Sequence, residues 1–213
     1  LSMPDISFNM NRIFPFKNIG KQGKKHWYDK IGLSYNMNTK NTIAIADSLL
    51  FTKNSFASFR NGMKHTIPIS TSVKVLKHFT LTPRISLTER WYLSQIQKSW
   101  DGNSVITDTL HKFTRAHDYS FSTGLNTKIY GLIQFNKSKL AAIRHVITPN
   151  LSFSYKPDFS EEKYGYYKSV QNDTLGGLQE YSMMQNGIFG TPSKGKSGNI
   201  NFSLGNILEM KIR

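Results

Sequence analysis

The side chains suited to catalysis or metal binding are six histidines, a few carboxylates and one glycine-rich stretch. The two histidines closest in sequence, His111 and His117, lack the spacing of metal ligands, and none of the nearby carboxylates completes a site around them. Glu161 and Glu162 form a pair in an expected loop. Residues 195–198 lack the strand and the helix that flank a phosphate-binding loop. We therefore expect no enzyme, with no catalytic residue, no cofactor and no bound metal.

Basic residues are placed more regularly, because many of them alternate with apolar residues along the chain. Arg84 and Arg90, for example, have the parity opposite to that of Ile85, Leu87 and Trp91. The basic residues placed in this way are Lys74, Arg84, Arg90, Lys128, Arg144, Lys156 and Lys211. Such groups could bind anionic groups such as phosphate through charge-assisted hydrogen bonds, or they could pair with acids on neighbouring elements. Both interpretations are open.

The elements that carry these residues show a period of two. Ile31, Leu33 and Tyr35 are apolar, for instance, whereas Gly32 and Ser34 between them are small or polar. Alternation of this kind is typical of strands with one apolar and one polar face, and no stretch shows a helical period as clearly. We expect about eight strands, at residues 5–16, 27–37, 43–52, 64–75, 79–93, 117–135, 140–156 and 199–213.

The connections between these strands alternate in length. Short turns are expected at 38–42, 76–78 and 136–139, and long loops at 17–26, 53–63, 94–116 and 157–198. Short turns at one end of an up-and-down sheet and long loops at the other are typical of an outer-membrane β-barrel, whose short turns are periplasmic and whose long loops are extracellular. Aromatic residues near the strand ends, such as Trp91, Tyr155 and Phe79, fit two interfacial girdles. We therefore expect an all-β, antiparallel, up-and-down transmembrane barrel.

A barrel also explains the composition. The 213 residues carry a formal net charge of +15, contain no cysteine and are 38% hydrophobic. The absence of cysteine excludes disulfides and cysteine-bound metals, and no apolar run is long enough for a membrane-spanning helix. An ionised side chain facing lipid costs about 2–4 kcal/mol at the midplane, so the alternating basic residues should face a wet lumen. The lysines at 17, 21, 24 and 25 fit anionic lipid as well as nucleic acid, and we expect no nucleic-acid partner.

Two segments resemble a known family. Residues 144–157, with Arg144, His145, Pro149 and Tyr155, resemble the barrel domain of the lipopolysaccharide-assembly outer-membrane proteins, the LptD or organic-solvent-tolerance family. Residues 199–211 resemble it too, and residues 1–16 look like a barrel strand of its variant forms. The residues of this chain that carry the two later motifs are Arg144, His145, Pro149, Tyr155, Asn206, Glu209 and Lys211.

The resemblance implies a large barrel in the cell outer membrane. Such a barrel receives lipopolysaccharide from a periplasmic bridge, holds a plug lipoprotein, LptE, in its lumen, and releases its cargo into the outer leaflet through a lateral gate. We read the chain as an internal piece of such a protein. The residues expected to contact anionic cargo or the plug are Lys74, Arg84, Arg90, Arg144 and Lys156. Two alternatives are another outer-membrane barrel, a diffusion channel or receptor, and a soluble basic β-sandwich that binds nucleic acid or glycan.

Overall fold

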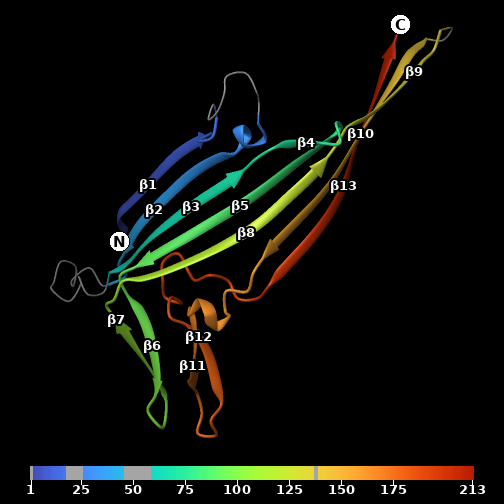
Figure 1. Ribbon diagram of the computed structural model, residues 1–213. Coiled ribbons are helices and arrows are strands. Elements are labelled where there is room, and N and C mark those ends of the chain that lie inside the picture. The colour runs from blue at the N-terminus through green and yellow to red at the C-terminus, as the bar shows by residue number, and fades with distance from the viewer. Residues whose placement is uncertain (1, 18–25, 46–58, 137–138) are drawn as a thin grey trace.

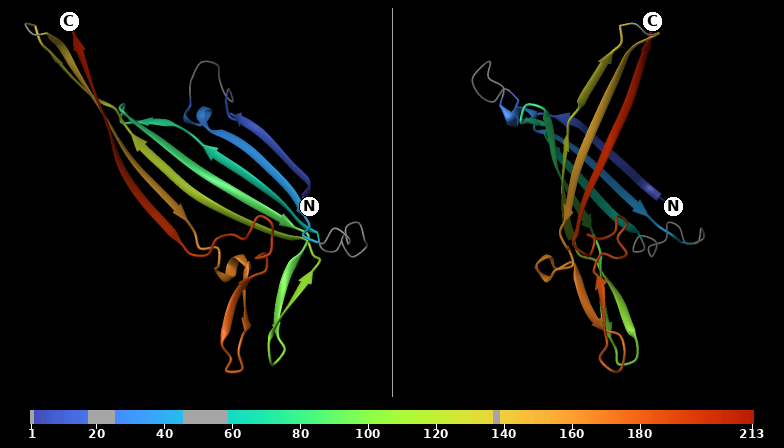
Figure 2. Two further views of the ribbon diagram at one scale, coloured as in Figure 1. Left: turned by 180° about the vertical axis from the view of Figure 1, so that it is seen from behind. Right: turned by 90° about the vertical axis from the view of Figure 1, so that its right-hand side faces the viewer.

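The computed structural model describes residues 2–17, 26–45, 59–136 and 139–213, and within these ranges the protein is almost entirely β-structure (Figure 1). A nine-stranded antiparallel sheet dominates it, and two views show this sheet as a strongly twisted, curved wall (Figure 2). Seven strands follow one another across the sheet: β1 (Ser2–Ile13), β2 (Gly32–Thr42), β3 (Arg60–Ser70), β5 (Phe79–Tyr92), β8 (Thr114–Asn126), β10 (Leu140–Lys156) and β13 (Ser197–Ile212). Two shorter strands complete it: β4 (Val73–Val75) pairs with β5, and β9 (Ile129–Gln134) pairs with β10.

The strand register sorts the side chains onto two faces. One row across the sheet consists of Leu33, Ile69, Ile85, Phe121 and Tyr155, which pair in turn from β2 to β10. The row one residue away consists of Gly32, Ser70, Arg84, Ser122, Ser154 and Asn199. Because neighbouring residues of a strand point to opposite sides, the sheet has an apolar face and a polar face. The alternation expected from the sequence is confirmed.

The apolar face is uncovered in the described part of the chain. Exposed fractions reach 52% at Phe8, 43% at Ile85, 45% at Leu151 and 68% at Phe202. Ladders of exposed apolar side chains on this scale mark a surface that meets lipid or another apolar partner. Two packed sheets would have buried these residues, so the β-sandwich interpretation is wrong for the described residues.

Two hairpins project from the end of the sheet where β5 ends and β8 begins (Figure 1). The first consists of β6 (Gln95–Trp100) and β7 (Val105–Leu110), and the second of β11 (Tyr167–Gln171) and β12 (Leu178–Ser182). They pack against each other through buried Ile96, Val170 and Tyr181. Two short 3-10 helices, η1 (Trp27–Lys30) and η3 (Glu162–Tyr164), complete the described elements. None of the helices in the described ranges has the length and apolar character needed to cross a membrane.

Several expected boundaries agree closely with the structure, and β10 occupies residues 140–156 as expected. The turn expected at 38–42 is wrong, because these residues lie inside β2 and pair with both β1 and β3. Their Asn and Thr side chains look turn-like in the sequence, but near the rim of a sheet the backbone ladder forms without apolar side chains. Of the strand expected at 43–52, residues 43–45 lie outside any strand and the rest fall outside the described residues.

The connections at the two ends of the sheet do not follow the strict alternation of short and long that was expected from the sequence. Most of the long loop expected at 17–26 lies outside the described residues, but its flanking strand ends, Ile13 and Gly32, are close to Ser70 in register. Both therefore lie at the end that carries the turns at 76–78 and 136–139, not at the hairpin end (Figure 1). The sequence could not show this. Each strand reverses the direction of the chain, so one wrongly assigned strand moves every loop before it to the opposite end of the sheet.

Candidate functional site on the polar face

A cavity of about 540 Å³ lies on the polar face. The residues that line it come from β1, β3, β5, β8, β10 and β13 and from residues 71 and 72: Arg12, Ser70, Thr71, Ser72, Thr82, Arg84, Ser122, Thr123, Gly124, Ser152, Phe153, Ser154 and Asn201. The lining combines two guanidinium groups with many hydroxyl groups. It is therefore suited to hydrogen bonding and to holding negative charge.

Arg84 lies in the middle of this cavity wall. It pairs in register with Ser70 on β3 and with Ser122 on β8, and its side chain is exposed. Among the described residues the side chain of Arg84 has no hydrogen-bond partner and no ion pair. Its charge is therefore available to a ligand.

Arg12 is a second guanidinium at this cavity, and sequence reasoning did not select it. A register shift between Met10 and Ile13 breaks the alternation of β1. Counting by twos from Met10 would place Arg12 on the apolar face, but its side chain crosses Gly32 on the polar face, where a Cβ would lie 1.9 Å from Nε. Arg12 Nη2 donates to the carbonyl oxygen of Ser70 at 2.9 Å. The bulge therefore adds a cation to the cavity that the sequence pattern conceals.

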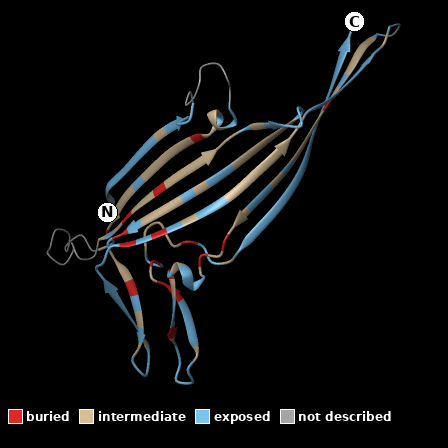
Figure 3. Cartoon of the chain, in the orientation of Figure 1, coloured by how far each residue is buried: buried red, intermediate tan, exposed pale blue. Residues whose placement is uncertain are grey.

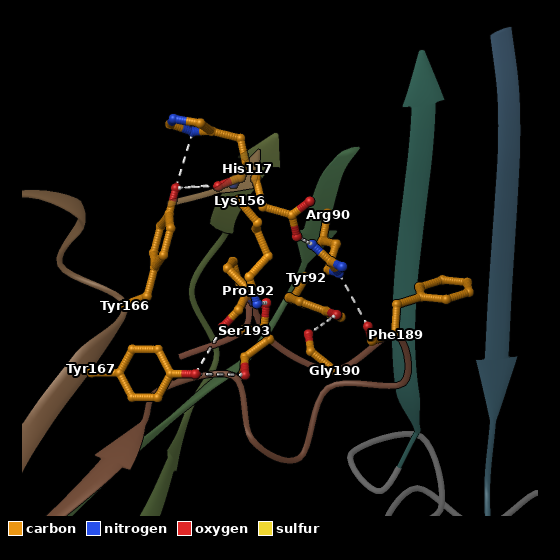
Figure 4. Close-up of polar contacts among 12 residues, drawn as sticks. Arg90, Tyr92, His117, Lys156, Tyr166, Tyr167, Phe189, Gly190, Pro192 and Ser193 are labelled. Atoms are coloured by element: carbon orange, nitrogen blue, oxygen red, sulfur yellow. Dashed lines mark hydrogen bonds and ion pairs between the residues drawn. The ribbon is translucent and has the colours of Figure 1, made fainter. Parts of the chain in front are cut away.

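Arg90 lies on the same face, but its charge is paired with a carboxylate. Its Nη1 is 2.5 Å from Asp118 Oδ2, and its Nε donates to the carbonyl oxygen of Phe189 at 3.1 Å (Figure 4). Only 12% of the Arg90 side chain is exposed. Arg90 therefore holds residues 157–196 against the sheet and is not free for a ligand.

The other three expected contact residues are not gathered in the cavity. Lys156 Nζ donates to Ser193 Oγ at 2.6 Å, so it also holds the connection between β10 and β13 (Figure 4). Arg144 pairs with Glu209 at 3.4 Å and lies over the ring of Tyr130. Lys74 is exposed on β4, outside the cavity lining. Of the five residues, the structure places Arg84 alone in the cavity.

The connection between β10 and β13 packs onto the hairpin end of the sheet. Buried Tyr92 and Ala116 from the sheet meet Phe159, Tyr166 and Met184 from this connection. Tyr92 also donates its hydroxyl to the carbonyl oxygen of Gly190 at 2.6 Å. Buried residues gather at this end of the molecule and are sparse along the strands (Figure 3). We call residues 157–196 the capping segment.

Tyr166 fixes the capping segment to a strand edge. Strand β10 pairs with β8 only from Phe121 onward, so over residues 114–120 no described strand adjoins β8 on that side. There the Tyr166 hydroxyl accepts from the His117 N–H at 2.9 Å and lies 3.2 Å from the His117 carbonyl oxygen (Figure 4). One side chain thus takes the place of a strand partner at this edge. Burial raises the pKa of this phenol further above its ordinary value of 10.0.

Asp158 holds the two ends of the capping segment together. Its Oδ1 accepts from the Ser160 hydroxyl at 2.6 Å, from the Ser160 N–H at 2.8 Å and from the Gly195 N–H at 2.9 Å. These hydrogen bonds, the Ser160 hydroxyl first, lower the pKa of the Asp158 carboxyl below its ordinary value. The described residues contain no cluster of three or more histidines or carboxylates that could hold a metal ion.

The family-motif residues come together along one strand pair. Strands β10 and β13 pair over nearly their full length, which sets Arg144 opposite Glu209 and Pro149 opposite Leu204. His145 also hydrogen-bonds to Asn206. Tyr155 and Lys211 lie near the two ends of the same pair. The two sequence motifs, one long connection apart, are therefore two sides of a single ladder.

A twisted antiparallel sheet with an exposed apolar face, a polar opposite face and up-and-down connections is a section of a transmembrane β-barrel wall. Residues 1–213, the whole chain, match the LptD protein family, and the chain belongs to that family. No match was found among curated proteins or among solved structures. The family acts in the outer membrane, in the handling of lipopolysaccharide, as a transport component and not as an enzyme. The family assignment and the all-β barrel class expected from the sequence are confirmed.

Proposed function

We propose that this chain forms part of the wall of an outer-membrane barrel that inserts lipopolysaccharide into the outer leaflet without covalent chemistry. In this proposal the apolar face meets lipid and the polar face lines a basic lumen, through which the cargo passes toward a lateral gate. The observation that carries it is the strict sorting of side chains, with exposed Ile85 and Leu151 on one face and Arg84 among hydroxyl groups on the other. Lipopolysaccharide is proposed as the cargo because the chain belongs to the LptD family.

The same proposal includes an orientation of the barrel in the outer membrane. The hairpins and the capping segment are extracellular, and the turns at 76–78 and 136–139 are periplasmic. The connection between β1 and β2 joins these turns on the periplasmic side, because its flanking strand ends lie there. Large structured insertions at one end and tight turns at the other are typical of outer-membrane barrels and support this orientation.

The proposed partners are lipopolysaccharide, the periplasmic bridge that delivers it, a plug lipoprotein of the LptE type, and outer-membrane lipid. Free cations on the polar face, at Arg84 and at Lys74, are the positions we propose for contact with anionic cargo or the plug. Arg90, Arg144 and Lys156 are already paired, so in this proposal they support the wall and its cap.

Depletion of the full-length protein in its own host tests the proposal. We expect surface lipopolysaccharide to fall and sensitivity to detergent to rise, with both restored by the wild-type gene. Normal surface lipopolysaccharide combined with a loss of small-solute uptake would instead favour a diffusion channel or receptor. Heat-dependent migration of the purified protein on gels checks that it is a folded barrel.

A further inference from the structure

We propose that the cavity around Arg84 is a binding subsite for a phosphorylated saccharide. If the protein carries lipopolysaccharide as proposed above, the subsite would take the hydrophilic part of that cargo and not its acyl chains. The identity of the cargo rests on the proposed function, but the chemistry of the subsite rests on the residues that line it.

The cavity carries positive charge that no described carboxylate balances. Carboxylates elsewhere on the polar face are already paired: Asp118 with Arg90, Glu209 with Arg144, and Asp5 with Lys40 at 3.7 Å. No Asp or Glu is among the described residues that line the cavity. A guanidinium with no counter-ion, surrounded by neutral groups, attracts an anion and binds phosphate through two N–H groups at once.

Neutral polar side chains surround the Arg84 guanidinium in the cavity lining. Ser70, Ser122 and Ser154 flank Arg84 in one row across the strands, and Thr82, Ser152 and Asn201 lie in the next row, with Gly124 between Thr82 and Ser152. Adjacent strands are about 4.8 Å apart, so hydroxyl and amide groups on neighbouring strands reach one small ligand together. Thr71 adds a buried hydroxyl that has no partner among the described residues. A lattice of short donors and acceptors suits sugar hydroxyl groups.

The lining contains few large apolar side chains. Phe153 is the single large apolar residue among the described residues that line the cavity, and the others are small, polar or basic. Gly124 lets the Thr82 side chain lie close against the middle of the wall, since a Cβ on Gly124 would lie 3.0 Å from Thr82 Oγ1. The cavity is thus open and cationic and is lined mainly by small polar side chains, which suits a phosphorylated sugar better than a lipid tail.

Arg12 completes the subsite from its edge. It is bound to the Ser70 carbonyl oxygen through one Nη, which leaves other N–H groups of the guanidinium for a ligand. Ser70 is also the register partner of Arg84. The two cations are therefore both next to Ser70, and both line the same cavity.

Binding to the purified full-length protein in detergent tests the subsite. The probes are deacylated, phosphorylated lipopolysaccharide oligosaccharide, its dephosphorylated form, and inorganic phosphate, each measured by titration calorimetry. We expect the phosphorylated oligosaccharide to bind best, and Arg84→Gln to weaken its binding at least tenfold. Gly124→Val, which fills the wall, should weaken binding of both oligosaccharides. Lys77→Gln, at an exposed turn outside the cavity, is the matched control and should bind as wild type does.

The outcomes separate the two proposals. Equal binding of the phosphorylated oligosaccharide by wild type and a heat-modifiable, folded Arg84→Gln variant would overturn the subsite. So would inorganic phosphate that binds as tightly as the oligosaccharide, because the site would then be a plain anion site. Loss of binding in Arg84→Gln while depletion leaves surface lipopolysaccharide normal would support the subsite and overturn the proposed transport function.

Discussion

Arg84 and Arg90 lie on the same face of β5, six residues apart, but within the described part of the chain only Arg90 has a counter-ion, Asp118 at 2.5 Å. The difference comes from their neighbours. Asp118 on β8 supplies a carboxylate to the Arg90 guanidinium, and the Phe189 carbonyl oxygen in the capping segment accepts a second hydrogen bond from it. Arg84 instead pairs in register with Ser70 and Ser122, which carry no charge. Two arginines of equal parity thus serve different purposes: Arg90 holds the cap in place, and Arg84 faces an open cavity.

The first prediction concerns the Arg90–Asp118 pair. Asp118→Asn leaves Arg90 partly buried without its counter-ion, and a hydrogen bond to a charged group contributes about 1.5–3 kcal/mol. We expect residues 183–193 to lose amide protection in hydrogen exchange by a corresponding amount, while β5 and β8 stay protected. Asp101→Asn, in the tip of the first hairpin, is the control. Unchanged protection of residues 183–193 would show that the pair does not hold the capping segment.

The second prediction concerns Tyr166. Tyr166→Phe keeps the ring in its cluster but removes the hydroxyl that bonds to the backbone of His117. An unsatisfied backbone group costs about 1–3 kcal/mol when it is buried, and less where water can reach it. We expect faster amide exchange at His117 and easier proteolysis within the capping segment. Tyr28→Phe, far from this end, should change neither, and a Tyr166→Phe protein as resistant as wild type would contradict the role assigned to the hydroxyl.

The fold class was predictable because alternation is a local signal. A strand with one face in lipid and one face in water repeats every two residues, so β10 could be placed from its own sequence. The predictions were wrong where the local residue pattern does not match the element that the residues form. Residues 38–42 carry turn-like side chains inside β2, and the bulge before Ile13 shifts Arg12 to the polar face.

The site was less predictable because its selectivity comes from long-range contacts. The alternation of side chains placed Arg84, Arg90 and Lys156 on the polar face, but it did not show which of them bind other residues of the protein. Phe189 is 99 residues from Arg90, and Ser193 is 37 residues from Lys156. The spacing of residues in the sequence does not predict contacts over such separations. The role of these residues in binding cargo or a plug therefore stays a prediction.

The third prediction tests the two faces of the sheet. Ile85→Lys places a charge in the middle of the apolar face, whereas Ser86→Lys places the same charge on the polar face next to it. A lysine facing lipid at the midplane costs about 2–4 kcal/mol, and a lysine in a wet lumen is tolerated. We expect Ile85→Lys to lower the free energy of unfolding in lipid vesicles by this amount and Ser86→Lys to leave it nearly unchanged. Equal losses in the two variants would mean that lipid does not cover the apolar face.

The fourth prediction is a pH dependence of the capping segment. The hydrogen bonds from Ser160 and from the Gly195 N–H, with nearby Lys194, lower the pKa of Asp158 below its ordinary value of 3.8. A carboxyl whose pKa is lowered by folding contributes stability above the unfolded value, and this contribution is lost as the pH falls through the folded pKa. The link between the two ends of the capping segment should therefore persist down to pH 3.8 and weaken only below it. Pepsin cleavage within residues 157–196, followed as the pH is lowered, measures this. In Asp158→Asn the segment should be cleaved more readily than in the wild type above pH 3.8, and the difference should disappear as the pH falls further and the wild-type carboxyl becomes protonated. An identical pH profile in the variant and the wild type would assign the transition to another carboxylate.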